Sequence, residues 1–253
     1  MIALNKRVAN SVSPVAMLKA HRVPVTAVVP CLLILVGCEF DNTSTGSLQE
    51  EPVAIELGHA DHANVELDMG AGEMVLRGGA EKLLDGRFEF NVPDWRPKVQ
   101  SSISGSHATI TIHEPENARL GGKRRYRWDL ALNDNVLLDL AMNCGAGHAR
   151  LQLGDLELRS VTVHMGAGQV DLDLRGHPTR DYDVNVSGGV GQATIRLPDN
   201  VGVRAEAHGG IGSIDVSGLE KHGDHYENSL YDNAKANIRL KVEGGIGEIR
   251  IIG

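Results

Sequence analysis

The 253-residue sequence predicts an all-β protein, a flattened single-chain β-solenoid of about 21-residue coils with an N-terminal β-subdomain. Two observations predict this class: short glycine turns recur along the chain, and apolar and polar residues alternate on both sides of each turn. Aromatic residues make up only 4% of the chain, so the expected core is aliphatic. The six turns are Gly70-Ala71-Gly72, Gly145-Ala146-Gly147, Gly166-Ala167-Gly168, Gly189-Val190-Gly191, Gly210-Ile211-Gly212 and Gly245-Ile246-Gly247.

The last five turns follow one another at intervals of 21, 23, 21 and 35 residues. An interval of about 21 residues holds two short strands and two turns, and such coils stack at the ~4.8 Å spacing of a sheet. The apolar parity slips by one residue across each turn, as a corner made by glycine would require. The longer last interval contains extra residues around Gly218 to Asp232, where we expect a loop or a cap.

The residues at the corners vary together. Met or Cys before the first glycine accompanies Ala in the middle of the turn, whereas Gly before it accompanies Val or Ile. We interpret this as an exchange that keeps the corner volume constant, as close packing requires. The residues before the turns are Met69, Cys144, Met165, Gly188, Gly209 and Gly244. Cys144 is therefore expected to occupy a packing column as a substitute for Met, without a reactive-thiol role.

The N-terminus predicts export. Residues 1–37 carry four basic and no acidic residues, and their apolar stretch is shorter than the ~20 residues of a membrane-spanning helix. The end of this segment, Leu35-Val36-Gly37-Cys38, resembles a bacterial lipoprotein signal, which implies lipidation of Cys38 and anchoring to the cell envelope, on the periplasmic or outer face. An ordinary signal peptide with an incidental cysteine is the alternative. Translation starts at either Met1 or Met17.

Polar residues dominate positions 38–52, which we interpret as a flexible tether. Residues 53–116 are predicted to form the N-terminal β-subdomain and residues 117–253 the β-solenoid repeat domain. Removal of the leader leaves 21 basic and 33 acidic residues, a formal net charge of −12, which argues against nucleic acid as a partner. Cys31 leaves with the leader, so an intramolecular disulfide is not expected.

The chain resembles the toast-rack proteins of the bacterial envelope over residues 53–253, and its C-terminal half is similar to the adhesin-like domain of cell-wall-active-antibiotic response proteins. The resemblance implies a β-solenoid in the cell envelope without enzymatic activity. It rests on the segments Met69–Ala80, Leu83–Phe88, Trp95–Pro97, Trp128–Leu130, Leu138–Leu140, Cys144–Gly147 and Val242–Ile249, and on their order along the chain.

Two segments contain residues that ligate metals, His59-Ala-Asp-His62 and His222-Gly-Asp-His225. Neither has the cysteine framework or the helical histidine spacing of a familiar zinc motif, so we expect solvated loops, with no metal and no cofactor. Calcium binding of the nonapeptide-repeat type needs Asp two residues after each turn, where this chain has Ala193, Ile214 and Ile249. That type of calcium site is excluded.

Solenoid enzymes that cleave polysaccharides use carboxylates on the outer face. The outward column three positions after each turn reads Val75, Arg150, Asp171, Thr194, Asp215, Arg250, and the column one position after it reads Glu73, His148, Gln169, Gln192, Ser213, Glu248. Neither column places two acidic residues in successive repeats, so no catalytic residue is predicted. A carbohydrate-active enzyme of the solenoid type stays an alternative, as does an envelope-stress regulator that acts through a membrane partner.

One basic patch, Lys123 to Trp128, has aromatic residues among its charges. In an exported acidic domain it indicates a solvated strand or a contact with an anionic envelope polymer. The leading expectation is a non-enzymatic, lipid-anchored envelope protein that presents a β-solenoid surface to a protein or polysaccharide partner.

Overall fold

The computed structural model describes residues 46–115 and 125–253, which belong to one compact unit. These residues form one 13-stranded sheet and a single short 3-10 helix. The predicted leader, the lipidation residue Cys38 and the basic residues Lys123 and Arg124 lie outside the described residues.

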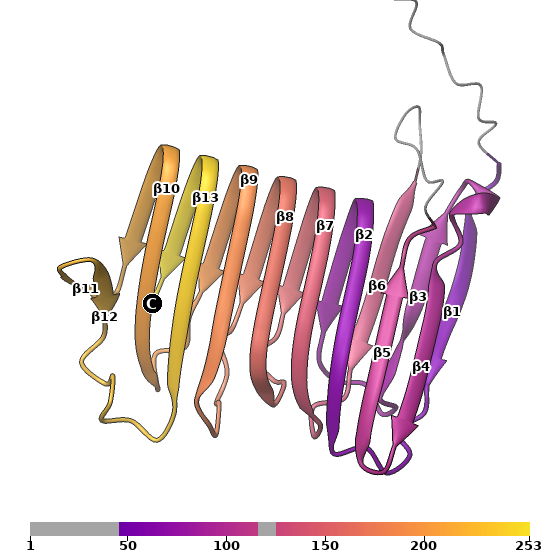
Figure 1. The fold of residues 1–253 in the computed structure, drawn as a ribbon, viewed down its shortest axis with the longest axis horizontal. Helices are drawn as coiled ribbons and strands as arrows, with labels where there is room; N and C mark the ends of the chain where they lie inside the picture. The colour runs from indigo at the N-terminus through magenta and orange to yellow at the C-terminus, as the bar shows by residue number, and fades with distance from the viewer. Residues whose placement is uncertain (1–45, 116–124) are drawn as a thin grey trace, which may run out of the picture. The chain divides into compact units, whose positions relative to one another are not determined.

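The elements follow one another along the chain as drawn in Figure 1. They are β1 (Gln49–Ile55), β2 (His62–Arg77), β3 (Leu84–Phe90), η1 (Pro93–Trp95), β4 (Lys98–Ser104), β5 (His107–His113), β6 (Tyr126–Leu132), β7 (Leu137–Gln152), β8 (Leu158–Asp173), β9 (Tyr182–Arg196), β10 (Gly202–Ser217), β11 (Glu220–His222), β12 (His225–Glu227) and β13 (Asn237–Ile252).

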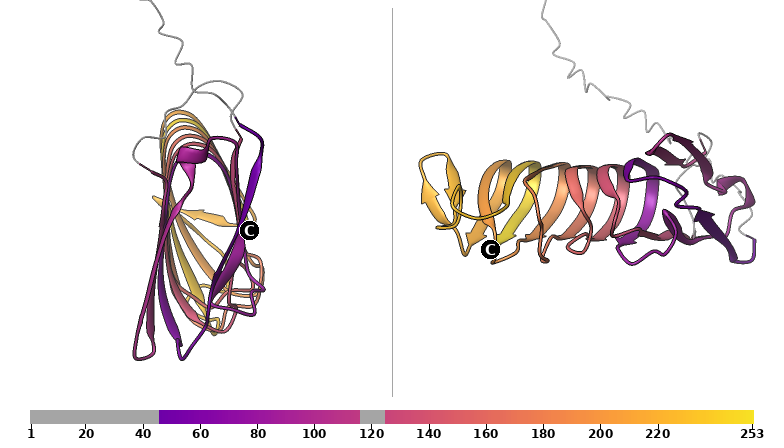
Figure 2. Two further views of the ribbon diagram at one scale, coloured as in Figure 1. Left: turned by 90° about the vertical axis from the view of Figure 1, so that its right-hand side faces the viewer. Right: turned by 90° about the horizontal axis from the view of Figure 1, so that it is seen from below.

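Six long strands, β2, β7, β8, β9, β10 and β13, each contain 15 or 16 residues and fold over at their glycine turn. Figure 1 shows them as nested bent ribbons, and the left view of Figure 2 shows their bends superposed along the stack. Neighbouring strands pair in parallel register, so that Met69, Cys144 and Met165 lie side by side. The predicted β-solenoid with coils of this length is confirmed.

Glycine is required at the bends because the backbones of successive coils approach closely there. The last glycine of each turn has a positive φ, for example 142° at Gly191. A Cβ atom on Gly191 would overlap the carbonyl oxygen of Gly168 in the neighbouring coil. Each bend therefore divides its strand into two arms, and the arms form two walls around an apolar interior.

The order of the coils in space is β2-β7-β8-β9-β13-β10, which differs from their order in the sequence. β13 lies between β9 and β10 and pairs in parallel with both. The long interval before it contains the hairpin β11–β12, and β12 pairs antiparallel with the first arm of β10. Of the loop or cap expected around Gly218 to Asp232, the structure shows a hairpin that caps the first arm of β10.

On the other side of the stack, β2 pairs with two different sets of strands. Its first arm pairs with β5, which pairs with β4, and its second arm pairs with β6, which leads through β3 to β1. β2 lies within the predicted subdomain 53–116 and also pairs along its whole length with β7. The strand pairing thus continues across the predicted boundary after residue 116. The division into two folding units at this boundary stays a prediction.

The interior is mainly aliphatic along the coils, and its aromatic cluster lies near β3 and β6; Tyr182 of β9 is buried apart from this cluster. The rings of Phe88 and Trp128, and those of Tyr126 and Trp95, make edge contacts at 5.6 Å between centroids. These rings are buried, as are the alternating Val, Leu, Ile and Met side chains of both arms in every long strand except β10, whose second arm leaves Ile214 exposed. The inward face of each arm is the face that the alternation predicts.

Candidate functional site

The bends of the first three coils have filled interiors. Met69, Cys144 and Met165 stand before their turns and are buried, which confirms the predicted packing column. Burial raises the pKa of the Cys144 thiol to about 11. Gly188, Gly244 and Gly209 occupy the same place in the last three coils and contribute no side chain to the interior.

The larger residues in the middle of those turns do not replace the missing volume. Val190, Ile246 and Ile211 are 54%, 51% and 72% exposed, so the expected exchange of volume within one corner is wrong. The physical reason lies at the first glycine of each of these turns, where the register between coils skips one pair: beyond this irregularity the middle residue reaches solvent instead of the interior. The three side chains lie on adjacent coils and form what we call the apolar ridge.

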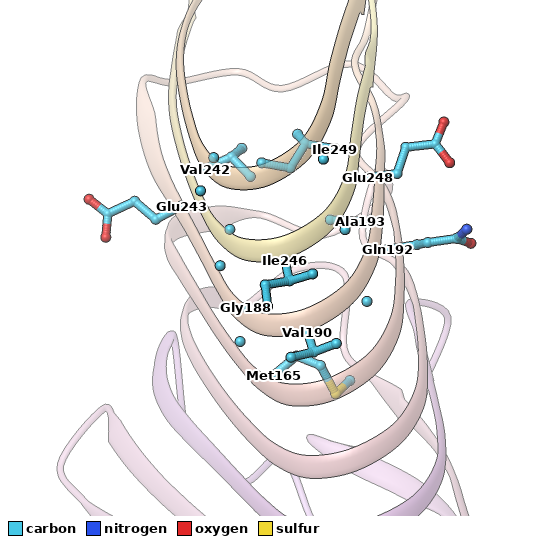
Figure 3. Close-up of a pocket in the computed structure, with 18 of the residues that line it drawn as sticks. Met165, Gly188, Val190, Gln192, Ala193, Val242, Glu243, Ile246, Glu248 and Ile249 are labelled. Atoms are coloured by element: carbon cyan, nitrogen blue, oxygen red, sulfur yellow. The ribbon is translucent and has the colours of Figure 1, made fainter.

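A cavity of about 90 Å³ lies at the bends of β9, β13 and β10. Its apolar walls include Met165, Val186, Val242, Ile249 and Ile214. Figure 3 shows Val242 and Ile249 on opposite arms facing each other, whereas the carboxylates beside them point away from the stack. The missing side chains of the three glycines leave this space, which we call the bend cavity.

The second arm of β10, Gly209–Ser217, has a free edge. β13 pairs with it on one side, and β12 pairs with β10 only at Arg204 and Ala205, in the first arm. Among the residues described, no strand covers the other edge of this second arm. Ile214 is 40% exposed there although the corresponding Ile249 in β13 is buried.

Asp215 is the one charged residue of this free arm. Arg250 lies beside it in register but binds Glu248 instead, at 2.5 Å between Nη2 and Oε1. Within the described part of the chain, the side-chain carboxylate of Asp215 therefore has no hydrogen-bond or ion-pair partner. We call the apolar ridge, the bend cavity and the free arm of β10 together the bend site.

A polar row lies on the outward face of the first arms, next to the bends, and consists of Asp68, Asn143, His164, Ser187, Glu243 and His208. The first four line a groove of about 680 Å³. The Asn143 amide donates to the Asp68 carboxylate at 2.6 Å, and His164 Nδ1 contacts Ser187 Oγ. A hydrolase needs a group that orients such a histidine, but within the described residues His164 has no carboxylate partner.

Glu114 closes the groove at the first coil. Its Oε2 atom accepts hydrogen bonds from the backbone N–H groups of Gly70 and Ala71, at 2.5 and 3.2 Å. Burial raises the pKa of the Glu114 carboxyl, since desolvation outweighs the two hydrogen bonds that lower it. A carboxylate thus occupies the place that a further coil would take.

The structure separates the two histidine segments considered for metal binding. The first leads into β2 and the second joins β11 and β12, with the coils of β7, β8, β9, β13 and β10 between them. His225 contacts Asp224 and Glu227, at 3.0 and 3.1 Å, and stacks on His222. Nowhere in residues 46–115 and 125–253 do three His, Cys, Asp or Glu side chains form a metal site.

The described part of the basic patch is engaged in ion pairs. Arg125 lies 3.5 Å from Glu89, and Arg127 lies 3.0 Å from Glu73. The spatial order of the coils changes both outward columns, since Arg250 lies between Thr194 and Asp215, and Glu248 lies between Gln192 and Ser213. Neither column places two carboxylates on neighbouring coils. In the described ranges, no helix has the length and apolar character needed to cross a membrane.

Sequence reasoning missed the bend site because it placed Val190, Ile211 and Ile246 inside the corner. The sequence does contain a signal for the bend cavity: the residue before the turn changes from Met or Cys to Gly, and this removes an interior side chain regardless of which residue is in the middle of the turn. The free arm of β10 could not be found in the same way, since it depends on the order of the coils in space.

Two families match the sequence. Residues 44–196 match the family described as the N-terminal domain of toast_rack, DUF2154. Residues 146–251 match the family described as cell wall-active antibiotics response LiaF, C-terminal. No curated protein sequence matches the chain.

A candidate cell adhesion protein from Clostridium sporogenes has a similar solved structure, with 27% sequence identity and a TM-score of 0.76. The alignment covers 81% of this chain and 99% of that one. A candidate adhesin from Bacteroides fragilis aligns over 81% of this chain and 97% of its own, at 10% identity and a TM-score of 0.29. The second TM-score does not establish a common arrangement of the whole chain.

Proposed function

The chain belongs to the toast-rack family, and from this membership we propose that it is a non-enzymatic protein of the bacterial cell envelope. In this proposal a lipid on Cys38 anchors the mature chain, and the bend site binds a partner protein. The second family and the Clostridium sporogenes structure support the envelope assignment, because their descriptions name a response to cell-wall-active antibiotics and cell adhesion.

The observation that carries the binding proposal is the apolar ridge. Val190, Ile246 and Ile211 expose aliphatic surface on three adjacent coils, beside an apolar cavity. Clustered exposed apolar surface on a soluble domain is typical of an interaction site. Elsewhere on the coils, outward positions carry paired charges and amides, such as His148 with Asp171 at 2.8 Å.

A protein fits this ridge better than a polysaccharide does. Sugars present C–H faces that stack on exposed aromatic rings, and the large rings near β3 and β6 are buried. Aliphatic side chains next to a free strand edge are instead what a polypeptide recognises. The ridge therefore favours the protein partner among the two kinds of ligand expected from the sequence.

Site-specific photo-crosslinking tests this function. A photoreactive residue at Ile246, in the full chain expressed in its native envelope, should give a discrete adduct with another protein. The same residue at Thr162, on the outward face of β8, is the matched control and should give none. Equal adducts at both positions, or none at Ile246, would contradict the proposal.

Glycan binding is a second candidate, which the polar groove next to Asp68, Asn143, His164 and Ser187 favours. Its amide, carboxylate, imidazole and hydroxyl groups can share hydrogen bonds with sugar hydroxyls. In this case, the protein should sediment with purified envelope polysaccharide and lose this property in an Asn143→Ala, His164→Ala variant. A parallel Arg124→Glu, Arg125→Glu variant tests the basic patch as the polymer contact.

Residues 146–251 match the antibiotic-response family, and this match favours the alternative that the protein is an envelope-stress regulator. A regulator would co-purify with a membrane sensor, and its deletion would change the response to cell-wall antibiotics. An unchanged response in the deletion strain would remove this alternative.

A further inference from the structure

We propose that the free arm of β10 accepts an extended segment of the partner protein as an added parallel strand. An aliphatic side chain of this segment closes the bend cavity beside Ile214, and a basic side chain meets Asp215. This inference rests on the proposed function, because it names the kind of partner that occupies the bend site.

The backbone of the free arm is ready to pair. Gly253 N donates to Ser217 O at 2.9 Å, so the peptide groups of Ser217 and, by alternation, Asp215 face β13. The groups of Ile214 and Val216 then face the free edge. An added strand would satisfy these groups in the manner of every other coil in the stack.

The free arm lacks the features that protect edge strands from new partners. Natural edges carry Pro, Lys or inward charges, and β1 contains Pro52 while β4 begins at Lys98. Gly209–Ser217 contains no Pro and no Lys. At the opposite end of the stack the carboxylate of Glu114 covers the bend of β2.

The stack itself shows which sequence fits the arm. β13 places Ile249, Arg250 and Ile251 beside Ile214, Asp215 and Val216. Because Arg250 binds Glu248, it leaves Asp215 without a counter-charge. A strand that repeats the aliphatic–basic–aliphatic order on the free side would supply both the missing cation and inward apolar side chains.

The bend cavity accounts for the aliphatic requirement. Ile214 lines it and is 40% exposed, so the interior of the last coil is open where a further strand would lie. The room left is greatest at Gly188, where an added Cβ atom would find its nearest neighbour, Met165 O, at 3.8 Å. At Gly209 and Gly244 the Cδ1 atoms of Ile214 and Ile249 lie closer, at 3.4 and 3.0 Å. An inward aliphatic side chain on the added strand would cover this opening and exclude water.

The cap excludes a complete coil from the same place. β12 pairs with the first arm of β10, and β11 pairs with β12 on its far side. Because paired strands lie about 4.8 Å apart, this hairpin occupies the position that the first arm of a further coil would need. Figure 1 shows β11 and β12 projecting beyond β10. A single extended strand on the second arm avoids the hairpin, whereas a second copy stacked end to end does not.

The probe is a fluorescent peptide that copies residues 246–252, the second arm of β13, with Gln in place of Glu248 so that its arginine is free to meet Asp215. Its fluorescence anisotropy is measured with the full mature chain, and we expect saturable binding. Ile214→Lys should weaken binding at least tenfold by placing a charge at the cavity mouth. Thr162→Lys, which adds the same charge on the outward face of β8 and away from the bend site, should change binding less than threefold. Circular dichroism and thermal melting establish that both variants fold.

A charge swap makes the test independent of the Ile214 variant. A peptide with Glu in place of Arg250 should bind the natural chain at least fivefold more weakly, and Asp215→Arg should restore its binding. No saturable binding of the first peptide, or equal binding to Ile214→Lys, would overturn the inference. Sedimentation that shows Ile214-dependent pairing of two copies would also overturn it.

The two proposals fail separately. If the peptide does not bind while Ile246 still gives its adduct in the envelope, the bend site binds a protein by another mode and only this inference is lost. If Ile246 gives no adduct, the proposed function itself is wrong.

Discussion

Glu114 shows at the scale of one residue how a repetitive stack ends. In the inner coils the glycine bends pack directly on one another, as Gly145 does on Gly70. On its other side the bend of β2 meets Glu114, which accepts hydrogen bonds from Gly70 N and Ala71 N. The carboxylate is partly desolvated there, and this raises its pKa.

Replacing Glu114 tests this cap. Glu114→Ala removes the acceptor for two N–H groups and should lower the free energy of unfolding by about 1–3 kcal/mol. Glu114→Gln retains an acceptor oxygen and should cost much less at neutral pH. Urea unfolding of the three proteins measures both differences, and an alanine variant as stable as the natural chain would contradict the cap.

The raised pKa of Glu114 also fixes the sign of a pH effect. A folded-state pKa above the ordinary value means that the folded protein binds the proton more tightly than the unfolded chain does. This contribution to stability is present below the ordinary carboxyl pKa and is lost as pH rises through the raised one. The natural chain should therefore lose stability relative to Glu114→Gln along an acid-to-neutral series.

Cys144 is a second residue whose environment determines its chemistry. Burial raises the pKa of its thiol from 9.0 to about 11, which lowers the thiolate fraction about a hundredfold at neutral pH. The folded mature chain should react with a thiol reagent at least that much more slowly than the same chain in urea. Cys144→Ser identifies the signal, and rapid labelling of the folded chain would contradict the packing role.

The bent strand is the element that the sequence predicts best. Period-2 alternation identifies both arms, and the parity slip at glycine identifies the corner, because each follows from local backbone geometry. Whether the Val190 side chain faces the interior or the solvent does not follow from local backbone geometry in this way. It depends on how the slip rotates the turn, and a constant-volume argument chose the wrong side.

Two glycines of one bend should respond differently to the same change. Gly191→Ala would force a side chain against Gly168 O at a φ of 142°, and it should cost about 3 kcal/mol or more. Gly188→Ala in the same strand has its nearest contact at 3.8 Å and should change stability by less than about 0.5 kcal/mol. Thermal unfolding of the pair measures the difference, and similar losses would show that the bend cavity is not available.

The order of the coils in space is a property of the whole molecule, and it could not be predicted from the sequence pattern. Gly189-Val190-Gly191, Gly210-Ile211-Gly212 and Gly245-Ile246-Gly247 are nearly equivalent, so any of these coils can pair with another in parallel register. The connection decides, because the β11–β12 hairpin covers part of β10 and the chain then returns to place β13 beside β9. This return is what makes β10, and not the last strand, the open end.

Anchoring is the remaining property at this scale, and Cys38 determines it in our proposal. The lipoprotein-like segment Leu35–Cys38 predicts a mature chain that begins at Cys38 with added acyl mass. Two or more acyl chains hold a protein stably on a membrane, where one chain does not. The natural protein should therefore partition with membranes, whereas Cys38→Ala should lose the acyl mass and the stable anchoring together. Intact mass and membrane partitioning of both proteins measure this. A natural chain without acyl mass would leave the solenoid and its bend site unchanged but would remove the envelope anchor, and the partner would then have to be sought among proteins in solution.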